Sequence, residues 1–224
     1  MPLPPRYDET RRSLHAVAEH VLAAALHQAT GRIGLRATSG GFGTPVFDRA
    51  GEAHQLLVIG TDLVVAVDGI EARRSPLRTV GEAAEAVGIT PGGPAEVYEL
   101  VTPLDPDAPL EPDPAAAELV HGWFALSAAA LDAFAALHPE EAPSSAQLWP
   151  EHFDLALTMD EVNYGGSPGD DDHAGPYLYV GPWSFDRAAD PLWNEPFGMS
   201  RLWHQVPDVE SAAELFDAGR RANR

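Results

Sequence analysis

The hydrophobic positions near the start of the chain recur at the spacing of an α-helix. Over residues 8–30 they fall on one helical face, and Gly31 then supplies a residue type that commonly ends helices. The pattern therefore predicts a first helix over 8–30. The residues on its apolar face are Leu14, Val17, Val21, Leu22 and Ala25.

Shorter patterns after this helix predict strands and a second helix. The β-branched runs 55–59 and 62–67 are separated by Gly60-Thr61, which is a strong signal for a β-hairpin over 55–67. A short helix is predicted near 78–88, and a strand over 96–101.

A broad apolar face over residues 114–137 predicts a long central core helix. Asp113 can cap it, and Pro114 suits the first helical position. Further on, the sequence predicts strands over 153–159 and 177–181 and an irregular aromatic segment over 183–208, with a last helix over 209–220. The fold class is therefore α+β, with one or two antiparallel sheets and a loop-rich aromatic C-terminal third.

Proline and acidic residues fill the segment 102–113, which is either an exposed linker or an extended strap across the surface. The sequence accordingly predicts a single α+β domain over residues 1–224, or two lobes, 1–101 and 114–224, joined by this strap.

The composition excludes several kinds of chemistry and partner. The chain has no cysteine, and all 14 of its basic residues are arginine, so thiol nucleophiles, thiolate metal sites and lysine Schiff bases are excluded. The net charge of −20 disfavours nucleic-acid and membrane partners, because an acidic surface repels phosphates. No segment has the pattern of a signal peptide or a membrane span, so a cytoplasmic protein is expected.

Residues 148–183 contain the densest set of acid/base groups and metal ligands in the chain. If 152–157 is a strand, alternate side chains share a face, which would bring His152 and Asp154 together. The predicted catalytic residues are His152, Asp154, Asp170 and His173. Three of these, His152, Asp154 and His173, are predicted to bind a divalent transition metal.

Aromatic side chains frame the same stretch and predict the walls of a substrate pocket: Trp149, Tyr177, Tyr179 and Trp183. The competing interpretation is structural. The carboxylates can cap local turns, the aspartates at 170–172 can form a solvated acidic loop, and the aromatics can simply pack.

The sequence Gly165–Gly169 matches the Gly-x-Ser-x-Gly pattern of a nucleophile elbow. The elbow requires the backbone N–H of the residue after serine as an oxyanion donor, but Pro168 has no N–H. Ser167 is therefore predicted to be a turn residue.

Three histidines lie on the first predicted helix: His15, His20 and His27. A metal site between helices would need a partner such as His121 or His138. No spacing fixes such a partner, so ordinary surface histidines are expected.

Two functions remain open. The first is a metal-assisted or acid/base enzyme that acts on a small molecule at a pocket around 148–183. The second is a non-catalytic ligand-binding or protein-interaction module, in which the aromatic C-terminal third packs against a ligand or another copy in a homo-oligomer.

Within the same block, LWPEHFD (148–154), SPGD (167–170) and PYLYV (176–180) resemble a signature of uncharacterised proteins from high-GC actinobacteria. The order of elements is similar to that of a wider bacterial family of unknown function: a helix, a Thr-Pro turn, a hairpin, a proline-rich strap, and a long helix leading into a His-Phe-Asp strand. The resemblance implies that the block matters, and it carries no known activity or ligand.

Overall fold

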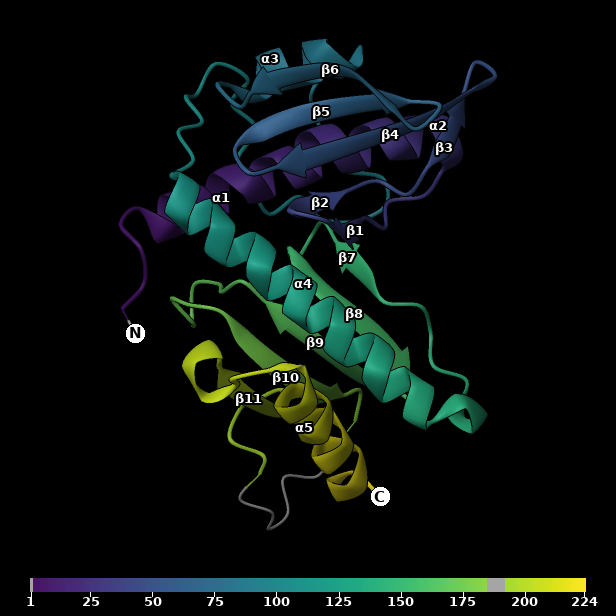
Figure 1. Cartoon of the computed structure of the whole chain (residues 1–224), viewed down its shortest axis with the longest axis vertical. Helices are drawn as coiled ribbons and strands as arrows, with labels where there is room; N and C mark the ends of the chain where they lie inside the picture. Colours follow the sequence, from purple (N-terminus) through teal and green to yellow (C-terminus); the bar gives the residue numbers. More distant parts are fainter. Residues whose placement is uncertain (1, 185–191) are drawn as a thin grey trace. The chain divides into compact units, whose positions relative to one another are not determined.

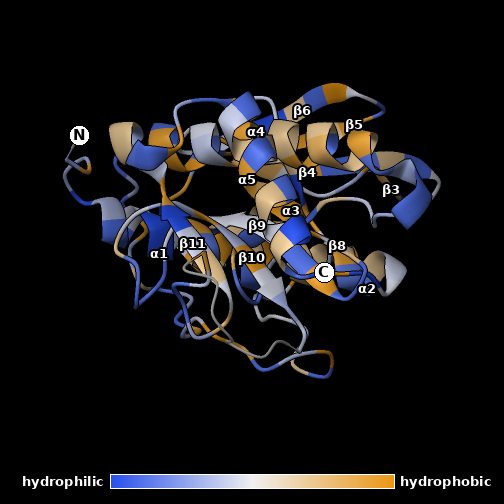
Figure 2. Cartoon of the chain, turned by 90° about the horizontal axis from the view of Figure 1, so that it is seen from below, coloured by the Kyte–Doolittle hydropathy of each residue, from blue (hydrophilic) through white to orange (hydrophobic). Residues whose placement is uncertain are grey.

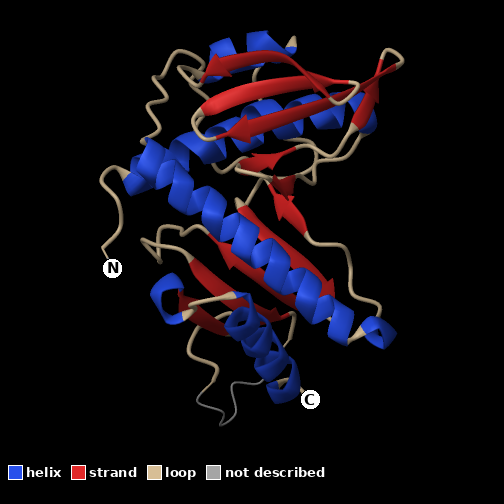
Figure 3. Cartoon of the chain, viewed as in Figure 1, coloured by secondary structure: helices blue, strands red, loops and turns tan. Residues whose placement is uncertain are grey.

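The computed structural model describes residues 2–184 and 192–224, and it confirms the α+β class with two antiparallel sheets. The chain forms two compact units. Figure 3 shows the strands of the two sheets in red and the helices in blue. The N-terminal unit contains residues 2–122 and 148–153, and the C-terminal unit contains 123–147 and the described residues from 154 onward. The strap 102–113 belongs to the N-terminal unit.

The first predicted helix is confirmed, and it contains a turn of π-helix. It consists of α1 (Tyr7–Val17), the π-helical turn η1 (Ala18–Ala23) and α2 (Ala24–Thr30). Gly31 ends it with φ of 73°, a left-handed conformation that glycine adopts without strain. The expectation of surface histidines is wrong for two of the three, because His15 and His20 are buried.

The π-helical turn carries a polar cluster that is closed to solvent. Glu19 and His20 are both 0% exposed. The Glu19 carboxylate accepts hydrogen bonds from the N–H groups of Val101 and Thr102 at 3.0 and 2.8 Å and from the Thr102 hydroxyl at 2.5 Å. His20 Nδ1 accepts from the Gly93 N–H at 3.1 Å. This cluster fastens the segment 92–102 to the first helix.

The sheet of the N-terminal unit has the order β1-β2-β4-β5-β6, with β3 also paired to β4. The predicted hairpin is confirmed as β4 and β5, and the second helix as α3, which Thr79 caps and Gly88 ends. The strand expected over 96–101 is wrong, because that segment has no strand. The bounds are β1 (Arg36–Thr38), β2 (Gly41–Gly43), β3 (Phe47–Arg49), β4 (Glu52–Ile59), β5 (Asp62–Val67), β6 (Ile70–Pro76) and α3 (Val80–Val87).

The long helix α4 (Pro114–Leu137) is confirmed with its predicted cap, because Asp113 accepts from the N–H groups of Ala115 and Ala116 at 3.0 Å. By length and composition α4 could cross a membrane, with a mean hydropathy of 1.4, which corrects the expectation that no segment has that character. The core helix of a soluble folded domain can have the same length and hydropathy. Figure 2 shows hydrophilic residues interspersed along α4. Its buried side chains include Ala116, Val120, Trp123, Phe124, Leu131 and Phe134.

The second sheet has the order β11-β10-β9-β8-β7, and its strands β8 to β11 belong to the C-terminal unit. Figure 1 shows α4 and α5 (Val209–Ala222) on the same side of strands β8 to β10. Aromatic rings join them, because Tyr164 lies 4.6 Å from Phe134 and 6.1 Å from Phe216, measured between ring centroids. The strands are β7 (Gln147–Trp149), β8 (Asp154–Met159), β9 (Val162–Ser167), β10 (Tyr177–Pro182) and β11 (Met199–Leu202).

The segment expected to be irregular, 183–208, contains β11 and a short 3-10 helix, η3 (Trp203–Gln205). Its residues 185–191 lie outside the described residues. A second 3-10 turn, η2 (Pro139–Glu141), follows α4. The last helix, predicted over 209–220, is confirmed as α5.

Candidate functional site

The first predicted site residue, His152, lies in a turn before β8 and is exposed. Phe153 between it and the strand has φ of 52°, which is a left-handed conformation. Because β8 begins at Asp154, the condition for placing His152 and Asp154 on one strand face is not met. His152 also belongs to the N-terminal unit, whereas Asp154 and His173 belong to the C-terminal unit.

Two carboxylate–phenol pairs lie on the sheet of the C-terminal unit. The Tyr179 hydroxyl donates to Asp154 Oδ2, and the Tyr177 hydroxyl donates to Asp170 Oδ2 at 2.5 Å. Burial raises the pKa of both tyrosines, and the neighbouring carboxylates raise it further. Both phenols therefore stay protonated at neutral pH and act as hydrogen-bond donors.

Asp170 organises the loop between β9 and β10. Its Oδ1 accepts from the N–H groups of Asp172 and His173 at 2.9 and 2.7 Å, as in a turn stabilised by an aspartate. Burial alone would raise the pKa of Asp170, but the Tyr177 hydroxyl and these two N–H groups hold it below its usual value. Asp170 thus acts as a turn residue and also as the carboxylate partner of Tyr177.

His173 lies between two carboxylates. Its Nδ1 is 3.4 Å from Asp170 Oδ1, and its Nε2 is 3.1 Å from Glu195 Oε1. The Tyr177 ring packs against the imidazole at a centroid distance of 4.3 Å. The same Glu195 oxygen accepts from the Ser200 hydroxyl at 2.6 Å. That bond, together with His173, keeps the pKa of Glu195 below its usual value against the opposing effect of burial.

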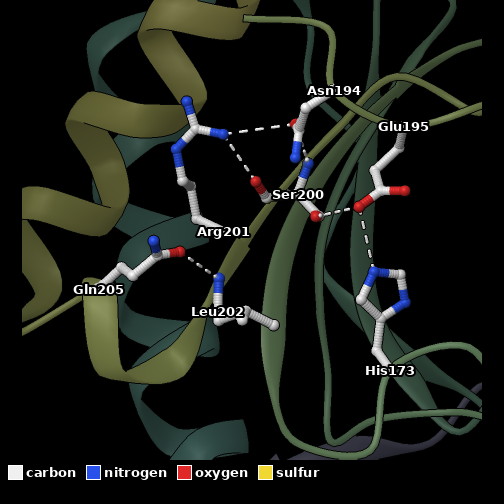
Figure 4. A pocket seen from close by; sticks show the side chains of 7 residues that line it. All are labelled: His173, Asn194, Glu195, Ser200, Arg201, Leu202 and Gln205. Carbon is white, nitrogen blue, oxygen red and sulfur yellow. Dashed lines mark hydrogen bonds and ion pairs between the residues drawn. The ribbon is translucent and has the colours of Figure 1, made fainter.

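His173, Glu195 and Ser200 line a cavity of about 310 Å³ (Figure 4). Arg201 projects beside it and donates from one guanidinium nitrogen to the Asn194 side-chain oxygen at 3.4 Å and to the Ser200 carbonyl at 2.7 Å. Of the four residues predicted to be catalytic, His173 alone is among those lining this cavity. The lining residues are His173, Asn194, Glu195, Ser200, Arg201, Leu202 and Gln205.

None of the four aromatics predicted as pocket walls is among the residues that line this cavity. Tyr177 and Tyr179 support the loop and the sheet through Asp170 and Asp154. Trp183 is 63% exposed and donates to Asn163, and Trp149 lies in the N-terminal unit. Sequence reasoning missed Glu195 and Ser200, because no short spacing connects them to His173.

Ser167 is the last residue of β9 and not part of the turn itself, but its side chain bonds to the local backbone as predicted. It is buried at the end of β9, and its hydroxyl accepts from the Gly169 N–H at 3.1 Å and donates to the Gly169 carbonyl at 3.3 Å. The hydroxyl is therefore engaged with the local backbone.

Among the described residues, one group of histidine and carboxylates has ligand atoms that all lie within 4.8 Å of one another: His138, Glu140 and Glu141. These are not the three residues predicted from the sequence. The signal was present locally, since the three fall within four consecutive positions, but His138 was considered only as a partner for the first helix.

Comparisons of the chain with protein-family models, with curated proteins and with solved structures found no match. The resemblance to an actinobacterial signature therefore stays a prediction.

Proposed function

We propose that the C-terminal unit is an acid/base catalyst that acts on a small polar molecule in the cavity at His173. The observation that carries this proposal is the position of His173, whose two ring nitrogens each face a carboxylate oxygen while the residue lines a cavity. Glu195 fixes the imidazole through Nε2, and Nδ1, whose 3.4 Å contact with Asp170 is the longer of the two, exchanges that contact for the bound molecule when it accepts or donates a proton.

The neighbouring groups define the kind of molecule. A neutral imidazole can donate to one of the two carboxylates, and an imidazolium can donate to both, so Asp170 and Glu195 support either protonation state of His173. Arg201 uses one guanidinium nitrogen in the hydrogen bonds above, and a guanidinium has further donors suited to a carboxylate or a phosphate. The proposed substrate therefore carries an anionic group and a proton that can be exchanged.

The test uses proton exchange, because exchange does not require the full reaction to be known. The protein is incubated in D2O with pyruvate, 2-oxoglutarate and acetoacetate, and proton NMR follows the loss of the C–H signals. We expect exchange faster than in protein-free solution, and His173→Asn should reduce it by about 100-fold or more. The matched control is His204→Asn, an exposed histidine in η3 that does not line the cavity.

A second candidate is a binding module without catalysis. Trp183 and Phe197 are 63% and 39% exposed, and exposed large aromatics commonly mark contact surfaces. Saturable binding of a carboxylate to both the native protein and His173→Asn, with no exchange by either, would favour this candidate. Exchange that is unaffected by His173→Asn would contradict the catalytic proposal.

A further inference from the structure

A second polar cluster lies at the far end of the C-terminal unit, where the chain leaves α4. His138 directly follows that helix, and the 3-10 turn η2 after it carries Glu140 and Glu141. One ligand atom from each residue comes within 4.8 Å of the other two. The short turn therefore brings one imidazole and two carboxylates to a single point.

The imidazole of His138 is fixed by a carboxylate from another helix. Its Nε2 lies 3.1 Å from Asp217 Oδ1 of α5. When Nε2–H donates to Asp217, the lone pair of Nδ1 is free to bind a cation. A histidine held in this way by a carboxylate is the usual arrangement around metal-binding histidines.

The carboxylate of Glu141 has two oxygens in different surroundings. Both guanidinium groups that reach it, those of Arg220 and Arg224, contact Oε1. Within the described part of the chain, Oε2 is shielded from solvent and accepts no hydrogen bond. A buried carboxylate oxygen without a donor is unfavourable, and a bound cation would remove that cost.

The surrounding charges leave room for a cation. Arg220 and Arg221 pair with Asp217. Arg220 and Arg224 also pair with Glu141, and both contact its Oε1 atom. Glu140 is exposed and makes no side-chain hydrogen bond among the described residues, so its charge is available. Among the described residues, the arginines therefore pair with Asp217 and with Glu141 Oε1, and none pairs with Glu140 or Glu141 Oε2.

We propose that His138, Glu140 and Glu141 bind a divalent transition-metal ion of the Zn²⁺ class, with Asp217 as the positioning residue. One imidazole nitrogen and two carboxylate oxygens are a donor set suited to such ions, and three protein ligands leave a position for water. Because Asp217 lies on α5, the ion stabilises the packing of α5 against the end of α4. This proposal is independent of the cavity at His173.

The experiment is calorimetric titration of the full chain, without a histidine tag, with ZnCl2 and with MnCl2. We expect one saturable site, and a loss of affinity of at least tenfold in His138→Gln, Glu140→Gln and Glu141→Gln. Asp217→Asn should weaken binding by roughly 10- to 100-fold, the range found for partners of metal ligands. Glu140 is exposed, so Glu140→Gln tests the site without disturbing the fold.

Three further variants act as controls: Glu214→Gln on the exposed side of α5, His152→Gln and His173→Gln. We expect each of them to bind within twofold of the native chain. In thermal melts, Zn²⁺ should raise the Tm of the native chain by several degrees and that of Glu140→Gln by less at the same Zn²⁺ concentration.

Absence of saturable binding would overturn the proposal, and so would equal binding by all variants. A loss of affinity in His152→Gln or His173→Gln while Glu140→Gln binds normally would place the ion elsewhere and also overturn it. Failure of the acid/base proposal would appear separately, as deuterium exchange that does not depend on His173.

Discussion

Two clusters in this protein each contain histidine and glutamate, but they differ in whether every carboxylate oxygen of the buried glutamate has a hydrogen-bond donor. In the N-terminal unit, Glu19 is fully buried and both of its oxygens accept hydrogen bonds from residues 101 and 102. In the C-terminal unit, Glu141 has one oxygen paired with two arginines and one with no donor among the described residues. The first cluster is satisfied by its own chain, and the second is not.

The difference teaches where to look for function. A buried carboxylate whose two oxygens both accept hydrogen bonds holds segments together, and a ligand would have to displace those bonds. A carboxylate with an unused, shielded oxygen keeps an unmet requirement that an ion can satisfy. Residue type alone cannot separate these cases, because both contain glutamate and histidine. The hydrogen-bond donors around each carboxylate oxygen determine whether the glutamate has a structural role or can bind an ion.

The sharpest test makes the same substitution in both clusters. In Glu19→Gln, the new amide nitrogen must face an N–H donor whichever way the side chain turns, because Val101 and Thr102 donate to the two oxygens. We expect the free energy of unfolding to fall by about 3–5 kcal/mol, as when a buried charged network is broken. Urea denaturation measures it, and a loss under about 1 kcal/mol would show that the cluster does not fasten 92–102.

The second prediction concerns His15, which lies close to the same cluster. Burial lowers its pKa to about 4 from an ordinary 6.5, so the folded chain keeps it neutral while the unfolded chain takes up a proton. Stability is therefore present above about pH 6.5 and is lost as pH falls toward about 4, by on the order of 3 kcal/mol. Denaturation at several pH values checks this against His15→Gln, which should lose that part of the slope. Identical slopes would contradict it.

The third prediction is the counterpart of the first. In Glu141→Gln without metal, the amide nitrogen can occupy the place of Oε2, where no donor stands, while the amide oxygen still accepts from Arg220. We expect a loss of about 1–2 kcal/mol, because charge-assisted hydrogen bonds become neutral ones. Added Zn²⁺ should widen the gap to the native chain. A loss as large as that of Glu19→Gln would remove the contrast between the clusters.

The smallest effect is expected at Ser167, whose hydroxyl bonds to the backbone of Gly169. Ser167→Ala should cost about 0.5–1.5 kcal/mol, the value of a local hydrogen bond. The native serine should not react with a fluorophosphonate probe, because no histidine or carboxylate hydrogen-bonds to its hydroxyl in the part of the chain that the structure describes. Labelling at Ser167, detected by mass spectrometry, would overturn this interpretation.

The sequence predicted those elements whose local pattern agrees with their environment. The hairpin over 55–67 and the helix over 114–137 combine clear periodicity with turn or cap residues, and both are confirmed. The strand expected over 96–101 failed because the backbone N–H of Val101 donates to the Glu19 carboxylate instead of to a neighbouring strand. The edge strand β6 was missed because nearly all of it is exposed, so its charged residues show no buried alternation.

The sequence predicted only those parts of the candidate site whose residues lie close together along the chain. The turn from Asp170 to His173 spans four positions and was found, although Asp170 proved to hold the turn as well as a phenol. Glu195 lies 22 positions beyond His173, and no local pattern connects them. The burial of His20 was missed because the prediction assumed a uniform helical period, whereas a π-helical turn occupies 18–23.

That turn gives the first helix an angular offset. Successive residues of an α-helix are about 100° apart, and a π-helical turn holds more residues than an α-helical one, so the apolar stripe of Tyr7–Val17 does not continue in phase into Ala24–Thr30. All six residues of Ala18–Ala23 are buried at the point where the phase changes. Deleting a single residue there could leave an unbroken helix, yet it would rotate everything beyond by roughly a quarter of a turn. The number of residues in this turn, and not only their identity, is therefore part of what the sequence encodes.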